Sequence, residues 1–308
     1  MIDIIGKRYI FFGLSLLIIL PGLIVLAIWG FPLAIDFTGG SLVEVRFESG
    51  NLPPPAEIIA LYKDLGVADV QVQTTGEGSI IARSSFLDDA TRIAVIDAME
   101  QNMNDALILL RFDSVGPTIG QEVASRAAIA VAFAALAVIL YITFAFRGIQ
   151  HAFRYGICAI LAMAHDVLVV ISLGALGGHF LGWQIDALFL TALLTVIGFS
   201  VQDKIVVFDR IRENSNIYRR LNYETLVNHS IIQTLQRSIN TQLMTVEFML
   251  LALALFGGVT LREFALILLI GLLSGTYSSI FIASSSLVVW DKHEWRSWFR
   301  RRSAQASA

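Results

Sequence analysis

Five ionisable residues lie inside long apolar stretches of this sequence, where a charge is costly. A charged side chain in a lipid bilayer costs about 2.5–3.5 kcal/mol on insertion scales, so each one needs a partner or a function. A buried carboxylate can shuttle protons when a guanidinium about 4–6 Å away makes or breaks contact with it, because burial and the positive charge shift its pKa in opposite directions. The five residues are Asp166, Asp203, Lys204, Arg237 and Glu247.

Asp203 and Arg237 are the first candidates for such a relay. At a rise of about 1.5 Å per residue they lie about 27 Å and about 29 Å from the outer ends of their apolar stretches, and therefore share one level in the cytoplasmic third. Residue types alone leave a proton relay and a static ion pair equally open. Asp166, which follows His165 and lies close to mid-membrane, is either a relay branch or a packing contact. Lys204 is expected to extend to the cytoplasmic interface.

Arg237 also begins a polar stripe on its helix. Residues spaced by three and four share one helix face, and a polar face turned to lipid would be untenable. We therefore expect the stripe to face the interior of the helix bundle and to support the relay, with Glu247 adding a polar contact. Its members are Arg237, Asn240, Thr241, Met244 and Glu247.

The composition is that of an integral membrane protein. Of 308 residues, 56% are hydrophobic and 15% are charged, and the mean hydropathy is +0.71, whereas soluble domains have about 45–50% apolar and about 25% charged residues. A net charge of −3 provides no basic surface for nucleic acid, which excludes that class of partner. The single cysteine, Cys158, excludes disulfides and Cys-based metal sites. We expect no cofactor and no metal.

Six stretches are long enough to cross the bilayer as helices, since a span needs about 20 mostly apolar residues. The first is too long for the apolar core of a signal peptide, and we expect it to be an uncleaved anchor. The stretches are Tyr9 to Phe31, Ala127 to Phe146, Tyr155 to Leu176, Ile185 to Phe208, Arg237 to Phe256 and Phe264 to Trp290. Lys and Arg concentrate on the side that holds both termini, which predicts that both termini are cytoplasmic.

A polar segment between the first two spans differs from the rest of the chain. Its pattern predicts strands over Leu42 to Phe47, Val70 to Thr75, Ser79 to Arg83 and Ile108 to Asp113, and helices over Pro55 to Leu65 and Asp88 to Asn104. The order β-α-β-β-α-β is typical of a ferredoxin-like α+β domain. The domains are thus 1–31, 32–124 outside the cytoplasmic membrane, 125–290 with a cytoplasmic amphipathic segment at 210–236, and a cytoplasmic tail at 291–308.

Seven stretches in these regions resemble the SecF family of the bacterial Sec protein-export machinery, within the wider resistance-nodulation-division-like transporters. The chain departs from the family where Gln202, Asp203 and Lys204 stand for Asn-Asp-Thr, where Ala34 stands for Gly, and at Glu247. The matching stretches are Asp36 to Gly40, Ser114 to Gly120, His165 to Val167, Gly198 to Val201, Val206 to Asn214, Arg237 to Thr241 and Gly275 to Ala283.

The resemblance implies a function in protein export. It assigns a proton-transport role to the positions of Asp203 and Arg237, and it implies a SecD-like partner of matching architecture beside the SecYEG channel. The chain would then use the proton-motive force to promote export of an unfolded preprotein through the bacterial inner membrane. The polypeptide-holding domain would belong to the partner, because the external domain expected here is too small for that task alone.

Two other functions compete with this interpretation. A proton-coupled half-transporter for a small hydrophobic molecule would use the same intramembrane charges, but pumps of that kind usually carry much larger external domains. An aspartyl intramembrane protease would use Asp166 and Asp203. The residues before Asp203 do not form Gly-x-Gly-Asp, and no metalloprotease or serine-hydrolase motif occurs, so we expect no enzymatic activity.

Overall fold

The computed structural model of the protein describes residues 3–75, 78–147, 152–242 and 248–294. The chain divides into a mixed α/β unit and a helical unit. The α/β unit comprises Pro32–Ala130 and Gln184–Ala187, and the helical unit comprises Met1–Phe31, Val131–Trp183 and Leu188–Ala308.

The α/β unit contains one antiparallel sheet of four strands, in the order β2-β3-β1-β4. Its elements in chain order are α2 (Ile35–Thr38), β1 (Gly40–Phe47), α3 (Pro55–Asp64), β2 (Gln71–Thr74), β3 (Ile80–Ser84), α4 (Asp89–Met103) and β4 (Leu107–Val115). The predicted order β-α-β-β-α-β is confirmed, and the strands and helices begin and end within two residues of their predicted bounds.

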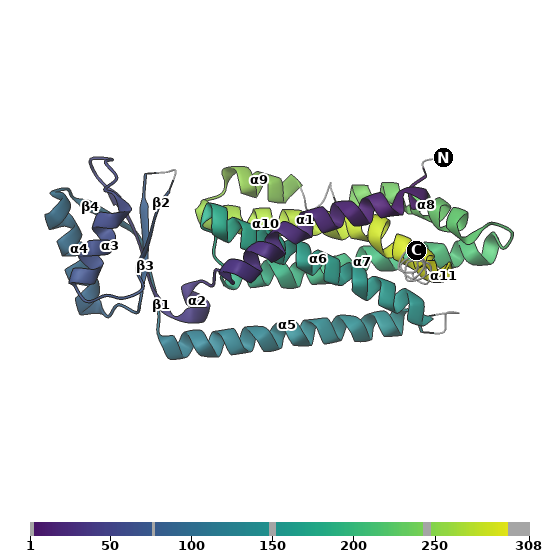
Figure 1. Ribbon diagram of the computed structural model, residues 1–308, viewed down its shortest axis with the longest axis horizontal. Coiled ribbons are helices and arrows are strands. Elements are labelled where there is room, and N and C mark those ends of the chain that lie inside the picture. The colour runs from purple at the N-terminus through teal and green to yellow at the C-terminus, as the bar shows by residue number, and fades with distance from the viewer. Residues whose placement is uncertain (1–2, 76–77, 148–151, 243–247, 295–308) are drawn as a thin grey trace, which may run out of the picture. The chain divides into compact units, whose positions relative to one another are not determined.

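Helices α3 and α4 cover one face of this sheet (Figure 1). Alternate residues of a strand point to the same face, and Val43, Val45 and Phe47 of β1 are accordingly all buried. They pack with Tyr62 of α3 and Met99 of α4 in one apolar core. Helix α4 begins at the predicted place because Asp88 caps it, its Oδ1 accepting a hydrogen bond from the backbone N–H of Thr91 at 2.8 Å.

Two consecutive glycines, Gly39 and Gly40, make the turn into β1. Both have positive φ, +75° and +129°, which residues with a Cβ rarely adopt. The space is also closed, because a Cβ on Gly39 would lie 2.7 Å from the Cα of Pro117 and one on Gly40 would lie 2.6 Å from the carbonyl oxygen of Ser84. The turn therefore needs glycine for its conformation and for the close approach of backbone.

We expect Gly39→Ala to destabilise the chain more than Gly50→Ala. Gly50 has a similar φ of +73° but open space around it. Its alanine variant is therefore destabilised only because a residue with a Cβ must adopt the left-handed conformation, which costs about 1–2 kcal/mol. The Gly39 variant must also displace the backbone at Pro117. Thermal unfolding of the purified chain in detergent measures both variants, and equal losses would show that the close approach contributes nothing.

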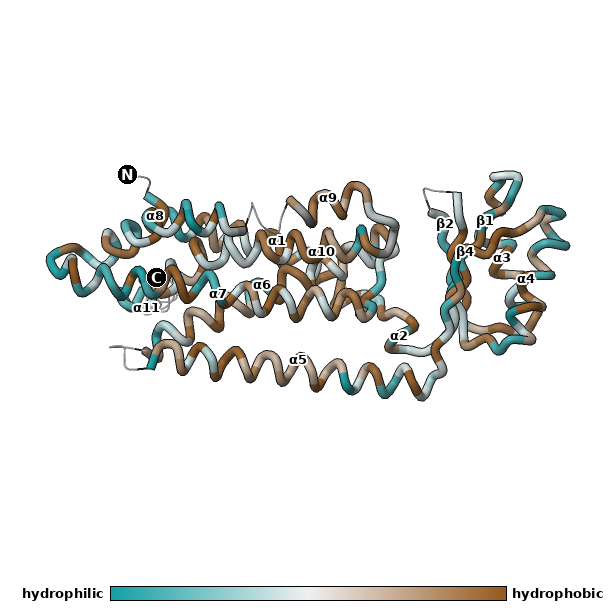
Figure 2. Tube along the Cα trace, turned by 180° about the vertical axis from the view of Figure 1, so that it is seen from behind, coloured by the Kyte–Doolittle hydropathy of each residue, from teal (hydrophilic) through white to brown (hydrophobic). Residues whose placement is uncertain are grey.

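Most long helices of the helical unit are apolar and largely brown in Figure 2, whereas α8 carries much teal. Its elements are η1 (Ile5–Lys7), α1 (Arg8–Trp29), the later part of α5 (Pro117–Ala145), α6 (Ala152–Leu181), α7 (Ala187–Ile217), α8 (Tyr223–Gln242), α9 (Phe248–Phe256), α10 (Val259–Tyr277), the π-helical segment η3 (Ser278–Ala283) and α11 (Ser284–Asp291). Helices α1 and α6 approach closely, since a Cβ on Gly22 would lie 2.0 Å from Ser172 Oγ.

Five helices within the described ranges are long and apolar enough to cross a membrane. They are Ile5–Trp29, Pro117–Ala145, Ala152–Leu181, Ala187–Ile217 and Leu261–Asp291, and each overlaps one of the six predicted spans. The remaining predicted span, Arg237 to Phe256, covers the end of α8, residues 243–247, which lie outside the described residues, and α9.

An ion-pair network joins the start of α1 to α8 and to the end of α11. Arg8 pairs with Glu224 at 2.8 Å and with Glu294, and Glu224 also pairs with Lys292. Asn228 of α8 adds to this junction, because its Oδ1 accepts hydrogen bonds from the backbone N–H groups of Ile4 and Ile5 at 2.9 and 3.3 Å. The first turn of the chain is thus attached to α8 by charge and by hydrogen bonds.

This network should make stability fall in acid. Hydrogen bonds from Lys292 and Arg8 lower the pKa of Glu224, so its contribution is present above the usual glutamate pKa of about 4.3 and is lost as pH falls through the lowered value. We expect Glu224→Gln to reduce this acid-dependent loss, with an effect of about 1 kcal/mol or less for such a partly exposed pair. Unfolding measured from pH 7 to pH 3 tests this, and identical pH profiles for both chains would contradict it.

Candidate functional site

The carboxylate of Asp166, on α6, is the centre of a fully buried polar cluster inside the helical unit. The residue has 0% exposure, and five donors surround its two oxygens. They are Ser200 Oγ at 2.6 Å, Lys204 Nζ at 2.8 Å, Ser274 Oγ at 2.8 Å, Ser278 Oγ at 2.7 Å and His165 Nδ1 at 3.0 Å. A carboxylate with this many donors is well matched to remain ionised in an apolar surrounding.

Lys204, on α7, is the positive partner of Asp166. Its side chain is completely buried, and its Nζ donates to Asp166 Oδ2 at 2.8 Å, to the backbone oxygen of Ser200 at 3.0 Å, and to Ser200 Oγ. The expectation that Lys204 extends to the interface is therefore wrong. Helix α7 continues to Ile217, about 20 Å beyond Lys204 at 1.5 Å per residue, and the side chain turns toward α6 instead.

Asp203, the neighbouring residue on α7, is held much more loosely. It is 8% exposed, and it accepts hydrogen bonds from Ser238 Oγ at 3.2 Å and from Ser279 Oγ at 3.3 Å. Both contacts are long for hydroxyl donors, which usually lie at about 2.7–2.8 Å. The two aspartates thus have contrasting environments, one saturated with short hydrogen bonds and one with two weak ones.

The π-helical segment η3 contacts both aspartates. Ser278 donates to Asp166 and the next residue, Ser279, donates to Asp203. Successive side chains on a helix point about 100° apart, so two adjacent serines can reach two different helices. Single π-turns inside α-helices occur frequently at functional sites. Segment η3 therefore connects the two carboxylates, although neither serine was among the residues we predicted for the site.

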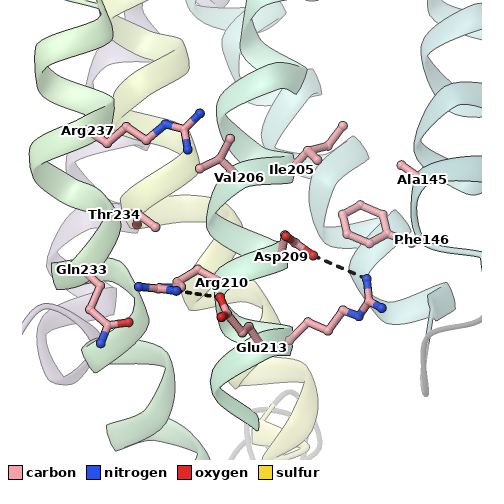
Figure 3. A pocket seen from close by; sticks show the side chains of 11 residues that line it. Ala145, Phe146, Ile205, Val206, Asp209, Arg210, Glu213, Gln233, Thr234 and Arg237 are labelled. Atoms are coloured by element: carbon pink, nitrogen blue, oxygen red, sulfur yellow. Dashed lines mark hydrogen bonds and ion pairs between the residues drawn. The ribbon is translucent and has the colours of Figure 1, made fainter. Parts of the chain in front are cut away.

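Arg237, on α8, lies beside a pocket rather than against Asp203. Among the described residues no ion pair or hydrogen bond joins Arg237 to Asp203. Figure 3 shows the guanidinium extending toward α7 beside Val206. The pocket, of about 370 Å³, is lined by Ala145, Phe146, Ile205, Val206, Asp209, Arg210, Arg212, Glu213, Gln233, Thr234 and Arg237. In its wall Arg210 pairs with Glu213 at 2.6 Å and Arg212 with Asp209 at 3.4 Å.

The predicted polar stripe of α8 lies on the exposed side of this helix. Arg237, Asn240 and Thr241 are exposed, so the expectation that they face the interior of this chain is wrong. The opposite face, with Ile231, Thr234 and Ser238, is the buried one, and Ser238 provides the contact to Asp203. Met244 and Glu247 lie outside the described residues.

No part of the chain that the structure describes holds three or more His, Cys, Asp or Glu side chains in an arrangement suited to a metal ion. The polar chemistry of the site comes instead from one ammonium, two carboxylates, one imidazole and several serine hydroxyls. Spacing gives a weak signal for Ser274 and Ser278, which lie four residues apart on one face of the last apolar stretch.

Buried carboxylates and an ammonium enclosed by membrane-length helices define a polytopic membrane protein with an ionisable intramembrane site, as in ion-coupled transport proteins. Two family models match the chain: protein export membrane protein SecD/SecF, C-terminal, over residues 95–293, and the SecD/SecF GG motif over residues 24–50. The chain belongs to the SecD/SecF family, which confirms the resemblance inferred from its sequence.

Individual relatives support the same assignment. The chain is 68% identical over its full length to protein translocase subunit SecF of Anaerolinea thermophila and 46% identical to that of Thermobaculum terrenum, with both chains covered completely in each case. The crystal structure of SecDF from Thermus thermophilus, described as a translocon-associated membrane protein, superposes with a TM-score of 0.82 at 33% identity. That match covers 94% of this chain and 39% of SecDF.

Proposed function

We propose that the chain is a non-catalytic accessory subunit of the Sec protein translocase. With a SecD-like partner, it uses the proton-motive force to promote export of unfolded preproteins through the SecYEG channel. The observation that carries this proposal is the loosely held carboxylate of Asp203 inside a bundle whose relatives are named translocase subunits. A carboxylate with few and long hydrogen bonds loses little when it takes up a proton.

In the proposed relay, Asp203 takes up and releases the proton. Arg237 controls this exchange, because a guanidinium that approaches the carboxylate favours its ionised form and one that withdraws favours the protonated form. The pocket beside Arg237, lined by charged residues of α7, would give water access to this end of the bundle. Motion of α8 against α7 would then switch the protonation of Asp203.

Asp166 forms a branch of the relay in this proposal. His165 would be the next group of this branch, because its Nδ1 lies 3.0 Å from Asp166 Oδ1 and its Nε2 has no hydrogen-bond partner among the described residues. The serines of η3 would transmit a change at Asp203 to Asp166, because Ser278 and Ser279 are adjacent in the chain.

We further propose the finer architecture that the family implies. Residues 32–124 form a ferredoxin-like extracytoplasmic domain, supported by the strand order β2-β3-β1-β4. Residues 125–290 with 1–31 form six spans in the bacterial inner membrane, and both termini, the segment 210–236 and the tail 291–308 are cytoplasmic. The SecDF relative of Thermus thermophilus, of which this chain matches 36%, supports a SecD-like partner of comparable or larger size.

The exposed polar stripe would face that partner. Asn240 and Thr241 lie on the same side of α8 as Arg237, and polar side chains turned to lipid would be unfavourable. A partner bundle packed against this side would cover them and complete the relay. Glu247, at the continuation of the stripe in the sequence, would contribute to the same interface.

Translocation into inverted membrane vesicles tests the proposal. Vesicles with SecYEG, the SecD-like partner and this chain receive an unfolded secretory precursor, and protease-protected precursor is measured with and without a proton ionophore. We expect a stimulation that depends on the chain and that the ionophore abolishes. If the chain instead drives ionophore-sensitive transport of a hydrophobic dye while precursor translocation is unchanged, the half-transporter alternative replaces this proposal.

A further inference from the structure

Lys204 differs from the other lysines and arginines that the structure describes in the helical unit, because it has no exposure at all. Long basic side chains in membrane helices usually reach toward the interface. Here the ammonium remains inside and is enclosed by oxygen atoms from α6 and α7. Burial of an ammonium is energetically costly even when it is paired. We therefore expect the charge to perform a task that a neutral side chain could not.

The surroundings of the Lys204 ammonium have the chemistry of a cation site. The Nζ contacts a carboxylate oxygen of Asp166, the backbone oxygen of Ser200 and the hydroxyl of Ser200. Carboxylate, carbonyl and hydroxyl oxygens are also what hard metal cations take as ligands, and carbonyl oxygens replace the hydration shell of K⁺ in channels. The ammonium already engages these oxygens at 2.8 and 3.0 Å, so a free cation that used the same oxygens would have to compete with it.

Two serines, Ser274 of α10 and Ser278 of η3, complete the surroundings of Asp166. Ser274 and Ser278 hold the two oxygens of Asp166 at 2.8 and 2.7 Å. They fix the carboxylate without contributing charge, so the negative charge of Asp166 is balanced by Lys204. A neutral residue at position 204 would leave an ionised carboxylate and its oxygen neighbours without a cation.

We propose that the ammonium of Lys204 is a tethered cation, which fills an oxygen-lined site and excludes free alkali-metal ions from the bundle. Lys204 is then the residue that determines ion specificity, and removal of its charge converts the cluster into a site for Na⁺ or K⁺. One consequence, that this chain couples to protons alone, rests on the proposed function. The exclusion of Na⁺ and K⁺ from the oxygen atoms around Asp166 does not depend on that function.

Thermal unfolding of the purified full chain in detergent tests the site. The wild-type chain, Lys204→Ser and Lys204→Gln are compared in NaCl, KCl and choline chloride at equal ionic strength. We expect the wild-type Tm to be the same in all three salts. We expect the Tm of both variants to rise with Na⁺ or K⁺ in a saturable way, since a ligand that binds only the folded state stabilises it.

Two further variants identify the origin of this response. Asp166→Asn combined with Lys204→Ser removes the carboxylate, and its Tm should not distinguish an alkali-metal salt from choline chloride. Lys292→Ser is the matched removal of an exposed lysine. Whatever its own Tm, that Tm should be the same in NaCl, KCl and choline chloride, as for the wild-type chain. A response in Lys204→Ser that persists without Asp166 would overturn the proposal.

Each remaining outcome also decides the question. The proposal is overturned if the wild-type Tm rises selectively with Na⁺ or K⁺, or if neither Lys204 variant responds. It is equally overturned if both variants fail to fold in every salt, because Asp166 would then have accepted no free cation. Vesicle translocation in NaCl and KCl is measured in parallel: wild-type vesicles without any proton dependence would remove the proposed function but leave the cation-binding result unchanged.

Discussion

Replacing Asp166 with asparagine is expected to lower the free energy of unfolding by about 3–5 kcal/mol, the usual cost of removing one partner of a buried ion pair. The substitution keeps the size of the side chain but leaves the fully buried ammonium of Lys204 without a counter-charge. It also replaces one acceptor oxygen by a donor, facing hydroxyl and ammonium donors on α7, α10 and η3. Reversible unfolding in mixed micelles measures the loss.

A surface ion pair provides the control for this prediction. Arg154 and Asp291 lie 3.1 Å apart, and their side chains are 27% and 40% exposed. Asp291→Asn should therefore cost no more than about 1 kcal/mol. The double variant Asp166→Asn with Lys204→Met should recover most of the stability lost by Asp166→Asn, because it leaves no uncompensated charge. Equal losses for Asp166→Asn and Asp291→Asn would refute the prediction.

The elements of the fold could be predicted because each depends on a local signal. Membrane-length apolar runs mark the spans whatever packs against them, and β3 alternates between buried and partly buried positions as a strand pattern predicts. The start of α4 at Asp89 follows from the capping preference of Asp88. None of these features needs knowledge of a distant contact.

The partners within the site could not be predicted in the same way. The pairing of Lys204 with Asp166 joins residues 38 positions apart, and it depends on how α7 is rotated against α6. Hydropathy does not determine that rotation when both helices are apolar on most faces. The depth calculation predicts that Asp203 and Arg237 lie at one level of the membrane. Depth alone does not tell to which side of its helix a side chain points, and Arg237 points into a pocket instead.

Helix α8 shows the same difficulty at one element. Helix α8 has two polar faces, and only one of them can pack against the interior of the bundle. One is the stripe with Arg237 and Asn240, and the other contains Thr234 and Ser238. A charged face costs more in contact with lipid than a hydroxyl face does, which predicts burial of the stripe, but the structure buries the hydroxyls next to Asp203. Small hydroxyl groups can bond their own helix, as Thr234 does with the backbone oxygen of Ser230 at 3.2 Å, and so they enter an apolar contact at low cost.

The second large effect is expected from Asp203→Asn. Asparagine can accept only one of the hydrogen bonds from Ser238 and Ser279, which reach different oxygens of Asp203, and its amide group can donate to the other hydroxyl. It cannot take up a proton, so the chain should fold and lose its coupling to the proton gradient. We expect the ionophore-sensitive part of precursor translocation to fall about tenfold or more. This is a smaller factor than the about 10²–10⁴-fold that a proton-transferring group contributes to the rate of an enzyme. Stability should change little, because the two hydroxyl contacts of Asp203 are long.

Asp209 on the same helix offers a matched control for this loss of coupling. It lies six residues beyond Asp203, lines the pocket near Arg237, and is exposed. Asp209→Asn makes the same chemical change at an exposed carboxylate and should retain the ionophore-sensitive translocation of the wild-type chain. Arg237→Met should reproduce the loss caused by Asp203→Asn, whereas Arg237→Lys keeps a positive charge and should retain part of the activity. Full proton dependence in Asp203→Asn vesicles would exclude this carboxylate from the relay, and the polar cluster at Asp166 would then be the next group to test.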